Sequence, residues 1–428
     1  MRLAVITSHP IQYHAPWFRF LAAKGLRDHG TTGPLDLRVF YLWDGGVTNQ
    51  LDRGFGVPVK WDIPLLDGYA HEFVPNRSRK PGPGHVSGLN NPTLGARVAA
   101  FKPDAILVFG YNYVSHYRFL FSQVARSVPL LFRGDSHRLP GGRGQRAEGR
   151  GQRSGGIKEA LRRRWIATVF RRFSAFLYVG QANRDYFRYH GVAERQLFFC
   201  PHCVDNDRFM AQAEEASRQA ALWKVELGIP PTHKVILFAG KFEPKKRPGD
   251  LIAAVKLAKL ENTTLLMVGN GELEPELRAA ALGPAPPSQL SAFSISAFPH
   301  IVFAPFQNQT RMPRTYAAAD VFVLPSFGRG ETWGLAVNEA MCMGRPVIVS
   351  DHVGCVQDLV HGHRNGLIFP AGNVPALAAA LQEAFAEPRR LRAWGEQSRE
   401  IIKGYSYEQA TKGLLAALEY LQEENAET

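Results

Sequence analysis

Short, continuous apolar runs separated by amphipathic stretches recur along the whole chain, and this alternation constrains the fold more than any other feature. Strands that are apolar throughout are typical of parallel sheets covered by helices on both faces. Two successive sets of such runs predict an α/β protein with two doubly wound domains. The predicted strands are Leu3–Thr7, Leu35–Tyr41, Ala105–Phe109, Leu130–Arg133, Phe176–Val179, Val235–Ala239, Thr264–Val268, Ile301–Ala304, Val321–Leu324 and Pro346–Ser350.

The positions of the two sets divide the chain. We expect a first domain over residues 1–205 and a second domain over residues 206–406. A last amphipathic segment, within residues 407–428, lies beyond the second set, and we expect it to pack back on the first domain. Two stretches rich in glycine, proline or serine, Pro75–Gly84 and Gly283–Pro299, predict loops.

Composition and charge limit the class of protein and its partners. The 428 residues are 45% hydrophobic and 21% charged, which excludes a disordered chain, a coiled coil and a collagen-like fibre. The chain has 51 lysines and arginines against 38 aspartates and glutamates. So large an excess predicts an anionic partner: nucleic acid, an acidic membrane surface or a phosphorylated small molecule.

Two features of the sequence, its first residues and the spacing of its cysteines, indicate where in the cell the protein is located. No apolar run approaches the roughly 18 residues that span a bilayer, and Leu3–Thr7 fits a buried strand better than a signal peptide. Cys200 and Cys203 form a C-x-x-C motif, but Cys342 and Cys355 do not supply the second pair that a zinc site needs. We therefore expect a cytoplasmic protein with reduced, partly buried thiols.

The first candidate site is a glycine followed by a cationic loop. The predicted strand Val235–Ala239 ends at Gly240, and the loop Lys241–Pro248 then leads into a helix. In open α/β sheets this arrangement binds phosphate, because backbone amides and the start of the helix supply partial positive charge. The alternative is a solvated basic turn.

The second candidate site is a glycine-rich loop, Pro325–Gly334, after another predicted strand. We expect a helix to begin near Thr332, with Glu331 at its start and Glu339 two turns inside it. Acidic side chains in such places can accept hydrogen bonds from the hydroxyls of a sugar or a ribose. The alternatives are a helix N-cap for Glu331 and a surface charge for Glu339.

The order and spacing of these motifs resemble the donor-binding half of family-4 retaining glycosyltransferases with the GT-B architecture. This resemblance implies two Rossmann-like domains that face each other across a cleft. It extends over nearly the whole chain and is most specific from Gly240 to Phe369. The motifs that carry it are Gly240…Lys246, Glu331-x₇-Glu339, Ala340–Ile348, Val268–Glu272, Tyr316–Asp320 and Asn365–Phe369.

The resemblance also implies roles for particular residues of the second half. Lys241, which stands where the family usually has arginine, and Lys246 would bind the donor diphosphate. Glu331 would contact the transferred sugar, and Glu339 would bind the ribose. The other residues implied to lie beside the nucleotide, the phosphate or the sugar are Gly240, Phe303, Asn308, Thr332, Gly334 and Leu335.

The first half resembles the acceptor-binding domain of the same family. His137 follows a predicted strand where the family often places a histidine near the donor sugar; the alternative is a structural histidine. His9, Gln12 and Tyr13 follow the first strand and would offer side chains to the acceptor side of the cleft. The D-x-D motif Asp205–Asp207 falls at the domain junction, so we interpret it as a turn and expect no metal site.

Taken together, the resemblance implies transfer of a sugar, with retention of configuration, from a nucleoside-diphosphate sugar to an acceptor hydroxyl. It implies neither a metal nor another cofactor, and it points to bacterial-type polysaccharide or glycolipid biosynthesis with a saccharide or lipid-linked acceptor. Two alternatives stay open: a non-catalytic polyanion or membrane-surface binder on a decayed scaffold, and a nucleotide-sugar epimerase of the same fold. The presence of Lys246, Glu331 and Glu339 favours the transferase.

The positive charge is concentrated between Arg138 and Arg172, where eleven cations stand against two carboxylates. No nucleic-acid recognition motif accompanies it, which argues against a nucleic-acid partner. We expect Gly141–Gly156 to form a basic loop and Ile157–Phe173 to form a helix that packs on the sheet. A membrane-surface helix is the alternative, and an anionic membrane would make the protein peripheral at the inner face. The apolar residues expected on one helix face are Ile157, Leu161, Trp165, Val169 and Phe173.

Overall fold

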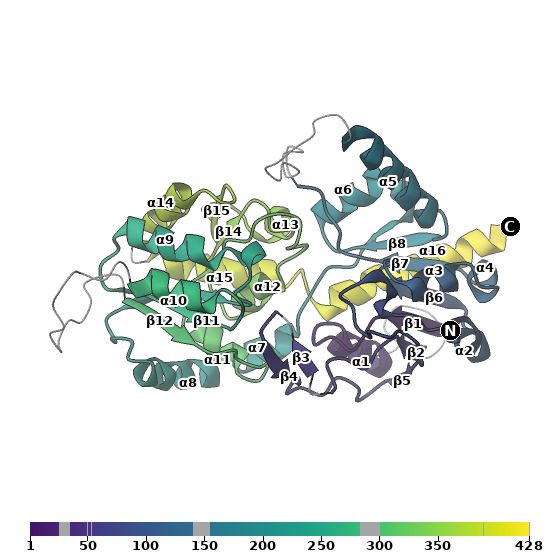
Figure 1. The fold of residues 1–428 in the computed structure, drawn as a ribbon, viewed down its shortest axis with the longest axis horizontal. Coiled ribbons are helices and arrows are strands. Elements are labelled where there is room, and N and C mark those ends of the chain that lie inside the picture. Colours follow the sequence, from purple (N-terminus) through teal and green to yellow (C-terminus); the bar gives the residue numbers. More distant parts are fainter. Residues whose placement is uncertain are drawn as a thin grey trace.

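The computed structural model divides the chain into two lobes, each built around one parallel sheet (Figure 1). The first sheet has seven strands and the second has six, and helices cover both. The fold class predicted from the sequence is therefore confirmed. The structure describes residues 1–24, 35–48, 50–52, 54–139, 155–282, 300–387 and 389–427.

The first sheet has the strand order β5-β2-β1-β6-β7-β8-β9. The inner strand β1 pairs with β2 on one side and with β6 on the other, so that Ile6 lies opposite Phe40 and Val108. Five of the six residues of β1 are buried, as the unbroken apolar run requires. The strands are β1 (Arg2–Thr7), β2 (Asp36–Tyr41), β5 (Ala70–Phe73), β6 (Ala105–Phe109), β7 (Leu130–Arg133), β8 (Ala175–Tyr178) and β9 (Leu197–Phe199).

The second sheet has the strand order β12-β11-β10-β13-β14-β15. Its chain order reverses at β10, with β11 on one side and β13 on the other, which creates the switch point where open α/β sheets bind ligands. The strands are β10 (Lys234–Ala239), β11 (Thr263–Val268), β12 (His300–Ala304), β13 (Val321–Leu324), β14 (Val347–Ser350) and β15 (Gly366–Phe369).

Helices cover both faces of each sheet, so each lobe has two apolar clusters, one on either face. Helices α1–α6 follow strands of the first sheet, and α7–α15 belong to the second lobe. Their bounds are α1 (Ala15–Lys24), α2 (Leu94–Phe101), α3 (Val114–Leu120), α4 (Val124–Ser127), α5 (Gly155–Phe170), α6 (Gln181–Tyr189), α7 (Asn206–Ala211), α8 (Ala213–Glu226), α9 (Pro248–Ala258), α10 (Glu274–Leu282), α11 (Met312–Ala317), α12 (Leu335–Cys342), α13 (Val356–Leu359), α14 (Val374–Phe385) and α15 (Arg390–Ile402).

The last helix, α16 (Tyr407–Glu427), returns from the second lobe to the first and packs beside β8 and β9 (Figure 1). Leu414 and Leu418 of this helix share an apolar cluster with Leu3 of β1. Thr411 accepts a hydrogen bond of 3.2 Å from the indole nitrogen of Trp17. The predicted return of the C-terminal segment is therefore confirmed.

The apolar face that we predicted for α5 is partly wrong. The face packed on the sheet consists of Ile166, Val169 and Phe170, whereas Leu161 and Trp165 are 63% and 49% exposed. A spacing of four residues drifts by about 40° around an α-helix at every step, so the predicted residues cannot all share one face.

Two predicted loops are only partly open to comparison. Residues 141–154 of the basic loop and the whole of Gly283–Pro299 lie outside the described residues. Pro75–Gly84 contains neither helix nor strand, as expected. Within the described ranges, no helix is long and apolar enough to cross a membrane.

Candidate functional site

The loops that follow the strands of both sheets meet where the two lobes face each other. The segments that carry the predicted site residues follow β1 and β7 in the first lobe and β10 and β13 in the second. Carboxyl ends of parallel strands lie at one edge of a sheet, which brings these loops together. The hydroxyl of Thr332 in the second lobe donates a hydrogen bond of 2.6 Å to Oδ2 of Asp135 in the first, so the lobes are in direct contact.

Close backbone packing fixes the loop after β10. Gly240 directly follows this strand, and Gly269, in the loop after β11, lies against it with a φ of +146°. A Cβ atom at residue 269 would lie 2.0 Å from the carbonyl oxygen of Gly240. Only glycine therefore fits at residue 269, and the backbone of both loops reaches the switch point of the second sheet.

Lys246 and Glu331 form a buried ion pair at this switch point. Lys246 ends a 3₁₀ turn after β10, and its Nζ contacts Oε2 of Glu331, which also accepts a 3.0 Å hydrogen bond from the hydroxyl of Ser326. The two side chains are only 16% and 11% exposed. The structure thus brings together the residue predicted to bind phosphate and the residue predicted to contact sugar.

Helix α12 begins later than we expected, which changes the surroundings of Glu331 and Thr332. The helix begins at Leu335, and its N-cap is Gly334 with a φ of +96°. Glu331 and Thr332 lie in the preceding loop, so the N-cap alternative for Glu331 is wrong. Leu335 packs against the apolar cluster of the second lobe, and the left-handed backbone at Gly334 turns the chain into the helix.

Glu339 is buried inside α12 and is only 2% exposed, which excludes the surface-charge alternative. Its Oε2 accepts a hydrogen bond of 2.8 Å from the hydroxyl of Tyr316, and its Oε1 accepts one of 3.2 Å from the amide of Gln309. Burial raises the pKa of this carboxyl above its usual value, although these donors counteract the rise. Tyr13 of the first lobe lies close enough to Glu339 to affect the pKa of this carboxyl as well.

Asp135 and His202 are site residues that the sequence reasoning missed. The carboxylate of Asp135 lies 3.6 Å from Nε2 of His202 and accepts the hydroxyl of Thr332. Burial alone would raise the pKa of Asp135, but His202 and Thr332 hold it below its usual value. Asp135 follows β7 only two residues before His137, so a strand-end position was the available signal for it.

His137 lies in the same segment and is buried. Burial is the main cause that lowers its pKa, and Arg329 and His352 of the second lobe lie near enough to affect this pKa. Within the described residues, neither ring nitrogen makes a hydrogen bond of normal geometry. The ring is therefore neutral at pH 7 and lies at the interface between the lobes.

Lys241 pairs with the first lobe. Its Nζ lies 2.8 Å and 3.0 Å from the two carboxylate oxygens of Asp52. Asp52 ends strand β3 (Gln50–Asp52), which forms a small antiparallel hairpin with β4 (Val57–Val59). The structure therefore places the two predicted phosphate-binding lysines in different ion pairs.

The residues predicted on the acceptor side, His9, Gln12 and Tyr13, all follow β1 in the first lobe. Nδ1 of His9 is 2.9 Å from the hydroxyl of Ser8, and burial lowers the pKa of His9 to about 4. Tyr13 packs against the apolar cluster of the second lobe, and Glu339 and Gln12 lie close enough to affect the pKa of its hydroxyl. Tyr13, predicted with the acceptor group, therefore lies near a residue predicted with the donor group.

The remaining donor-side residues lie along β12 and its following loop. The guanidinium of Arg278 lies 4.6 Å from the centre of the Phe303 ring, on the outer strand β12. The side-chain amide of Asn308 donates a hydrogen bond of 2.7 Å to the carbonyl oxygen of Lys60 in the first lobe. The loop after β12 is thus a further place where the lobes touch.

The D-x-D motif, which we interpreted as a turn, instead begins helix α7, with Asp205 at the N-cap and Asp207 inside the helix. Asp205 caps α7 by accepting a 3.0 Å hydrogen bond from the backbone of Arg208. Cys200 and Cys203 are buried free thiols, and Arg133 donates a 2.7 Å hydrogen bond to the carbonyl oxygen of Cys200. In the part of the chain that the structure describes, no three potential metal ligands gather.

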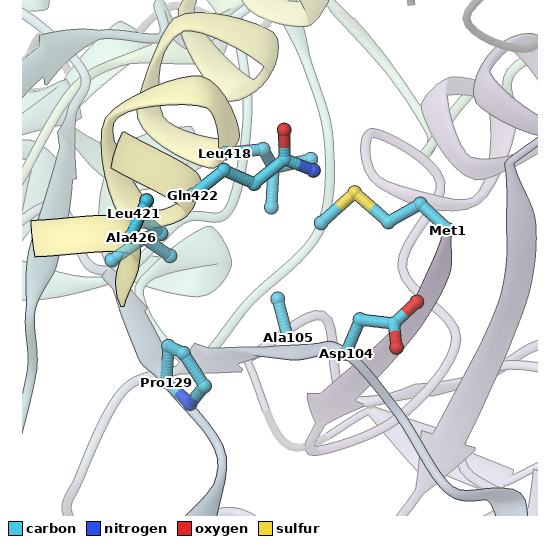
Figure 2. A pocket seen from close by; sticks show the side chains of 8 residues that line it. All are labelled: Met1, Asp104, Ala105, Pro129, Leu418, Leu421, Gln422 and Ala426. Carbon is cyan, nitrogen blue, oxygen red and sulfur yellow. The ribbon is translucent and has the colours of Figure 1, made fainter. Parts of the chain in front are cut away.

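A cavity of 370 Å³ lies elsewhere, between α16 and the amino ends of β1 and β6 (Figure 2). Apart from Asp104 and Gln422, its lining is apolar, with side chains such as Met1 and Leu421 facing one another. The cavity opens at the edge of the first sheet opposite the strand ends that carry the predicted site.

Comparison with known proteins agrees with the motifs of the second lobe. A family model described as "Glycosyl transferases group 1" matches residues 220–401. A D-inositol 3-phosphate glycosyltransferase of Rhodococcus jostii is 31% identical over 234 residues, or 53% of this chain. One from Jonesia denitrificans is 28% identical over 221 residues, or 50% of this chain. The matches span about half of these relatives, 48% and 49% of their lengths respectively.

Solved structures resemble both lobes together. HepE of Anabaena, in a crystal structure with UDP, has a TM-score of 0.67 and 17% identity, over 98% of this chain and 100% of that one. Sucrose-phosphate synthase of Thermosynechococcus elongatus has a TM-score of 0.65 and 20% identity, with full coverage of both chains. At such identities the likeness concerns the fold. Residues 220–401, which make up most of the second lobe, therefore match the group 1 glycosyl transferase model, and the two lobes together have the GT-B fold.

Proposed function

We propose that this protein transfers a sugar from a nucleoside-diphosphate sugar to an acceptor hydroxyl. The observation that carries the proposal is the buried ion pair of Lys246 and Glu331, the residues implied to contact the diphosphate and the sugar. The bond that must break joins a sugar to a diphosphate. The cation can contact the diphosphate, and the neighbouring carboxylate can contact the sugar. The Anabaena HepE structures with UDP and with UDP-glucose support a uridine nucleotide as the first donor to test.

Positive charge would stabilise the leaving group. The departing nucleoside diphosphate gains negative charge as the bond breaks, and Lys246 offers a positioned cation in a site of low exposure. Lys241 would add a second cation once it leaves Asp52. In this proposal the lysines supply the positive charge that the diphosphate needs, so no metal is invoked.

Glu339 would bind the ribose. Each carboxylate oxygen already accepts one hydrogen bond, from Tyr316 or from Gln309, and can accept another. Two ribose hydroxyls could donate to this remaining capacity. The existing donors hold the carboxylate in place before the nucleotide arrives, which lowers the entropic cost of binding.

We propose further that the reaction retains the configuration of the sugar. The acceptor hydroxyl would attack from the face that the diphosphate leaves, and a departing phosphate oxygen would take the hydroxyl proton. The glycosidic bond to phosphate breaks as the bond to the acceptor oxygen forms, so the nucleoside diphosphate leaves with the proton. The acceptor would be a saccharide or a lipid-linked saccharide in polysaccharide or glycolipid biosynthesis.

A Lys246→Ala variant tests the proposal directly. The variant lacks the positioned cation that would stabilise the leaving diphosphate, so its kcat should be lower by about 100-fold. Lys234→Ala is a matched control, because Lys234 also pairs with a carboxylate, Asp320 at 3.1 Å, but at the opposite end of β10. Near-normal turnover by Lys246→Ala, at a melting temperature equal to that of the control, would remove this lysine from the mechanism.

Product analysis separates the transferase from the alternatives. Wild-type protein would be incubated with a panel of nucleotide sugars, with and without saccharide acceptors, and the products would be examined by NMR. A new glycoside with the donor's anomeric configuration is expected. An altered sugar nucleotide without acceptor would indicate an epimerase, and inversion would contradict the proposed stereochemistry.

We also propose that α5 lies against an anionic membrane surface. Leu161 and Trp165 are exposed on this helix, next to the exposed cations Arg162, Arg163 and Arg164. Exposed apolar side chains flanked by cations are typical of helices that lie in a membrane interface. Such a contact would keep the protein at the membrane without a spanning helix.

Vesicle sedimentation tests this contact. Replacing Leu161 and Trp165 by serine should reduce binding to phosphatidylglycerol vesicles by about tenfold, since each apolar side chain contributes to interfacial binding. The control replaces Leu222 and Val225, which are even more exposed, on α8 of the other lobe. Equal binding by both double variants would contradict the proposal.

A further inference from the structure

The β3–β4 hairpin of the first lobe reaches across to the second lobe. In Figure 1 both strands lie at the junction of the lobes, near α7. The ring of Phe55, in the hairpin turn, lies 4.4 Å from that of Phe306. After the hairpin, Asp62 accepts a 3.0 Å hydrogen bond from the backbone of Thr310. The hairpin therefore touches the loop that follows β12, beside which we expect the nucleotide.

Asp52 organises the hairpin and contacts Lys241 at the same time. Its Oδ1 accepts hydrogen bonds of 2.8 Å and 3.1 Å from the backbone amides of Gly54 and Phe55, which fixes the turn. Both of its oxygens also contact Nζ of Lys241. Burial would raise the pKa of Asp52, but Lys241 and the two amides lower it below its usual value, so the carboxylate is ionised at pH 7.

The hairpin also covers Lys241. Nζ of this lysine lies 4.8 Å from the centre of the Phe55 ring, and its side chain is 31% exposed. A Cβ atom on Gly54 would lie 2.5 Å from Cδ of Lys241, so the hairpin backbone runs directly along the lysine. The cation is therefore enclosed by a carboxylate, a ring and a backbone turn, all from the other lobe.

We infer that Asp52 is a positioning residue that competes with the donor diphosphate for Lys241, and that donor binding releases the hairpin from this lysine. The inference rests on the proposed function. A diphosphate and the carboxylate of Asp52 cannot both contact one ammonium group without strong mutual repulsion. Asp52 thus keeps Lys241 ordered and neutralised in the empty cleft, and the site favours ligands with enough negative charge to displace a carboxylate.

Charge removal at Asp52 tests the competition. Asp52→Asn keeps an oxygen for the amides of Gly54 and Phe55 but loses the charge. Calorimetric titration should therefore show that this variant binds UDP about fivefold more tightly than the wild type does. The reason is that UDP no longer has to displace a partly exposed ion pair, which contributes about 1 kcal/mol. Asp67→Asn, which changes an exposed carboxylate of the same lobe, should bind UDP as the wild type does.

A double-mutant cycle makes the test specific for Lys241. Lys241→Gln should weaken UDP binding, and adding Asp52→Asn to it should then give no gain, because the two residues act through each other. A gain of equal size in both backgrounds would show a general charge effect and overturn the inference. Unchanged or weaker binding by Asp52→Asn alone would overturn it as well.

Hydrogen exchange on the wild type gives an independent readout. Addition of UDP should speed exchange in residues 54–62, because the hairpin loses its hold on Lys241. Slower exchange there would mean that the hairpin closes over the nucleotide, and would overturn the inference while leaving the proposed function intact. Wild-type protein that binds neither UDP nor any other nucleoside diphosphate would overturn both.

Discussion

At the scale of single residues, the cleft is a set of carboxylates that each have a fixed donor. Glu331 pairs with Lys246, Asp52 pairs with Lys241, and Asp135 accepts from Thr332. Glu339 is the most deeply buried of the four. Burying a carboxylate that has no hydrogen-bond donor costs more free energy than a hydrogen bond normally contributes to stability. The cleft can therefore contain these acidic groups only because each of them has a donor.

Removal of one donor from Glu339 should therefore destabilise the fold. Tyr316→Phe deletes the 2.8 Å hydrogen bond and leaves a buried acceptor unsatisfied. The free energy of unfolding should fall by about 1–3 kcal/mol. Urea denaturation at pH 7 measures this, with Tyr420→Phe as control, since the Tyr420 hydroxyl makes its hydrogen bond to Glu424 on the surface. Equal stability of the two variants would contradict the prediction.

Which of these residues the sequence could predict depends on where their partners lie along the chain. Lys246, Glu331 and Glu339 belong to spaced motifs within one domain, and motif spacing identified them. Asp52 lies 189 residues before Lys241, in a hairpin with no apolar alternation to mark it. A pairing of that kind depends on how the two lobes meet, which no local pattern encodes.

At the scale of elements, Asp358 joins a helix of one lobe to a helix of the other. It lies in α13, and its carboxylate oxygens accept hydrogen bonds of 3.1 Å and 3.0 Å from the backbone amide of Gln181. Gln181 is the first residue of α6, so the carboxylate satisfies an amide that the helix itself leaves without a partner. Tyr405 adds a hydrogen bond of 3.3 Å.

This contact should make stability depend on pH in an unusual direction. Burial raises the pKa of Asp358 to about 6. Between pH 4 and pH 6 the folded protein keeps this proton more readily than the unfolded chain, so stability falls as pH rises through that window. Relative to Asp358→Asn, the wild type should lose roughly 2 kcal/mol between pH 4 and pH 7. Denaturation midpoints that run parallel for both proteins would contradict this.

The elements also show where sequence patterns succeed and fail. All ten predicted strands are present, with ends that differ by one residue or less. Nine of them are inner parallel strands, which must be apolar on both faces, whereas β12 lies at a sheet edge. The strands that we did not predict include the edge strands β5, β9 and β15. Edge strands are short and are less completely buried than inner strands. Polar residues such as His71 and Glu72 can therefore occur in β5, and they interrupt the apolar pattern that would predict a strand.

At the scale of the whole molecule, the chain crosses between the lobes twice. Cys203 belongs to an apolar cluster of the first lobe, and the next residue, Val204, belongs to one of the second. The return crossing runs from Ile402 to Tyr407. The first lobe is therefore completed only when α16 has folded onto it, and its stability depends on residues at the far end of the sequence.

A cavity in α16 should accordingly destabilise the first lobe. Leu414 is fully buried in the cluster that contains Leu3 and Val5. Leu414→Ala should lower the stability of that lobe by about 2–5 kcal/mol, the usual cost of such a truncation. Hydrogen exchange in β1 and β8 would report the loss, whereas β10 and β11 should change little. Glu419→Ala, on the exposed face of the helix, serves as control.

The return of α16 also fixes how the molecule would bear tension. Residues 1 and 427 both lie in the first lobe, so a pull between them reaches the second lobe only through the two crossings. The parallel strand β1 and the helix α16 would bear the pulling force first. The second lobe would bear no force until α16 detaches from the first lobe. In an optical trap, the protein should therefore unfold in two steps, with the first lobe yielding before the second.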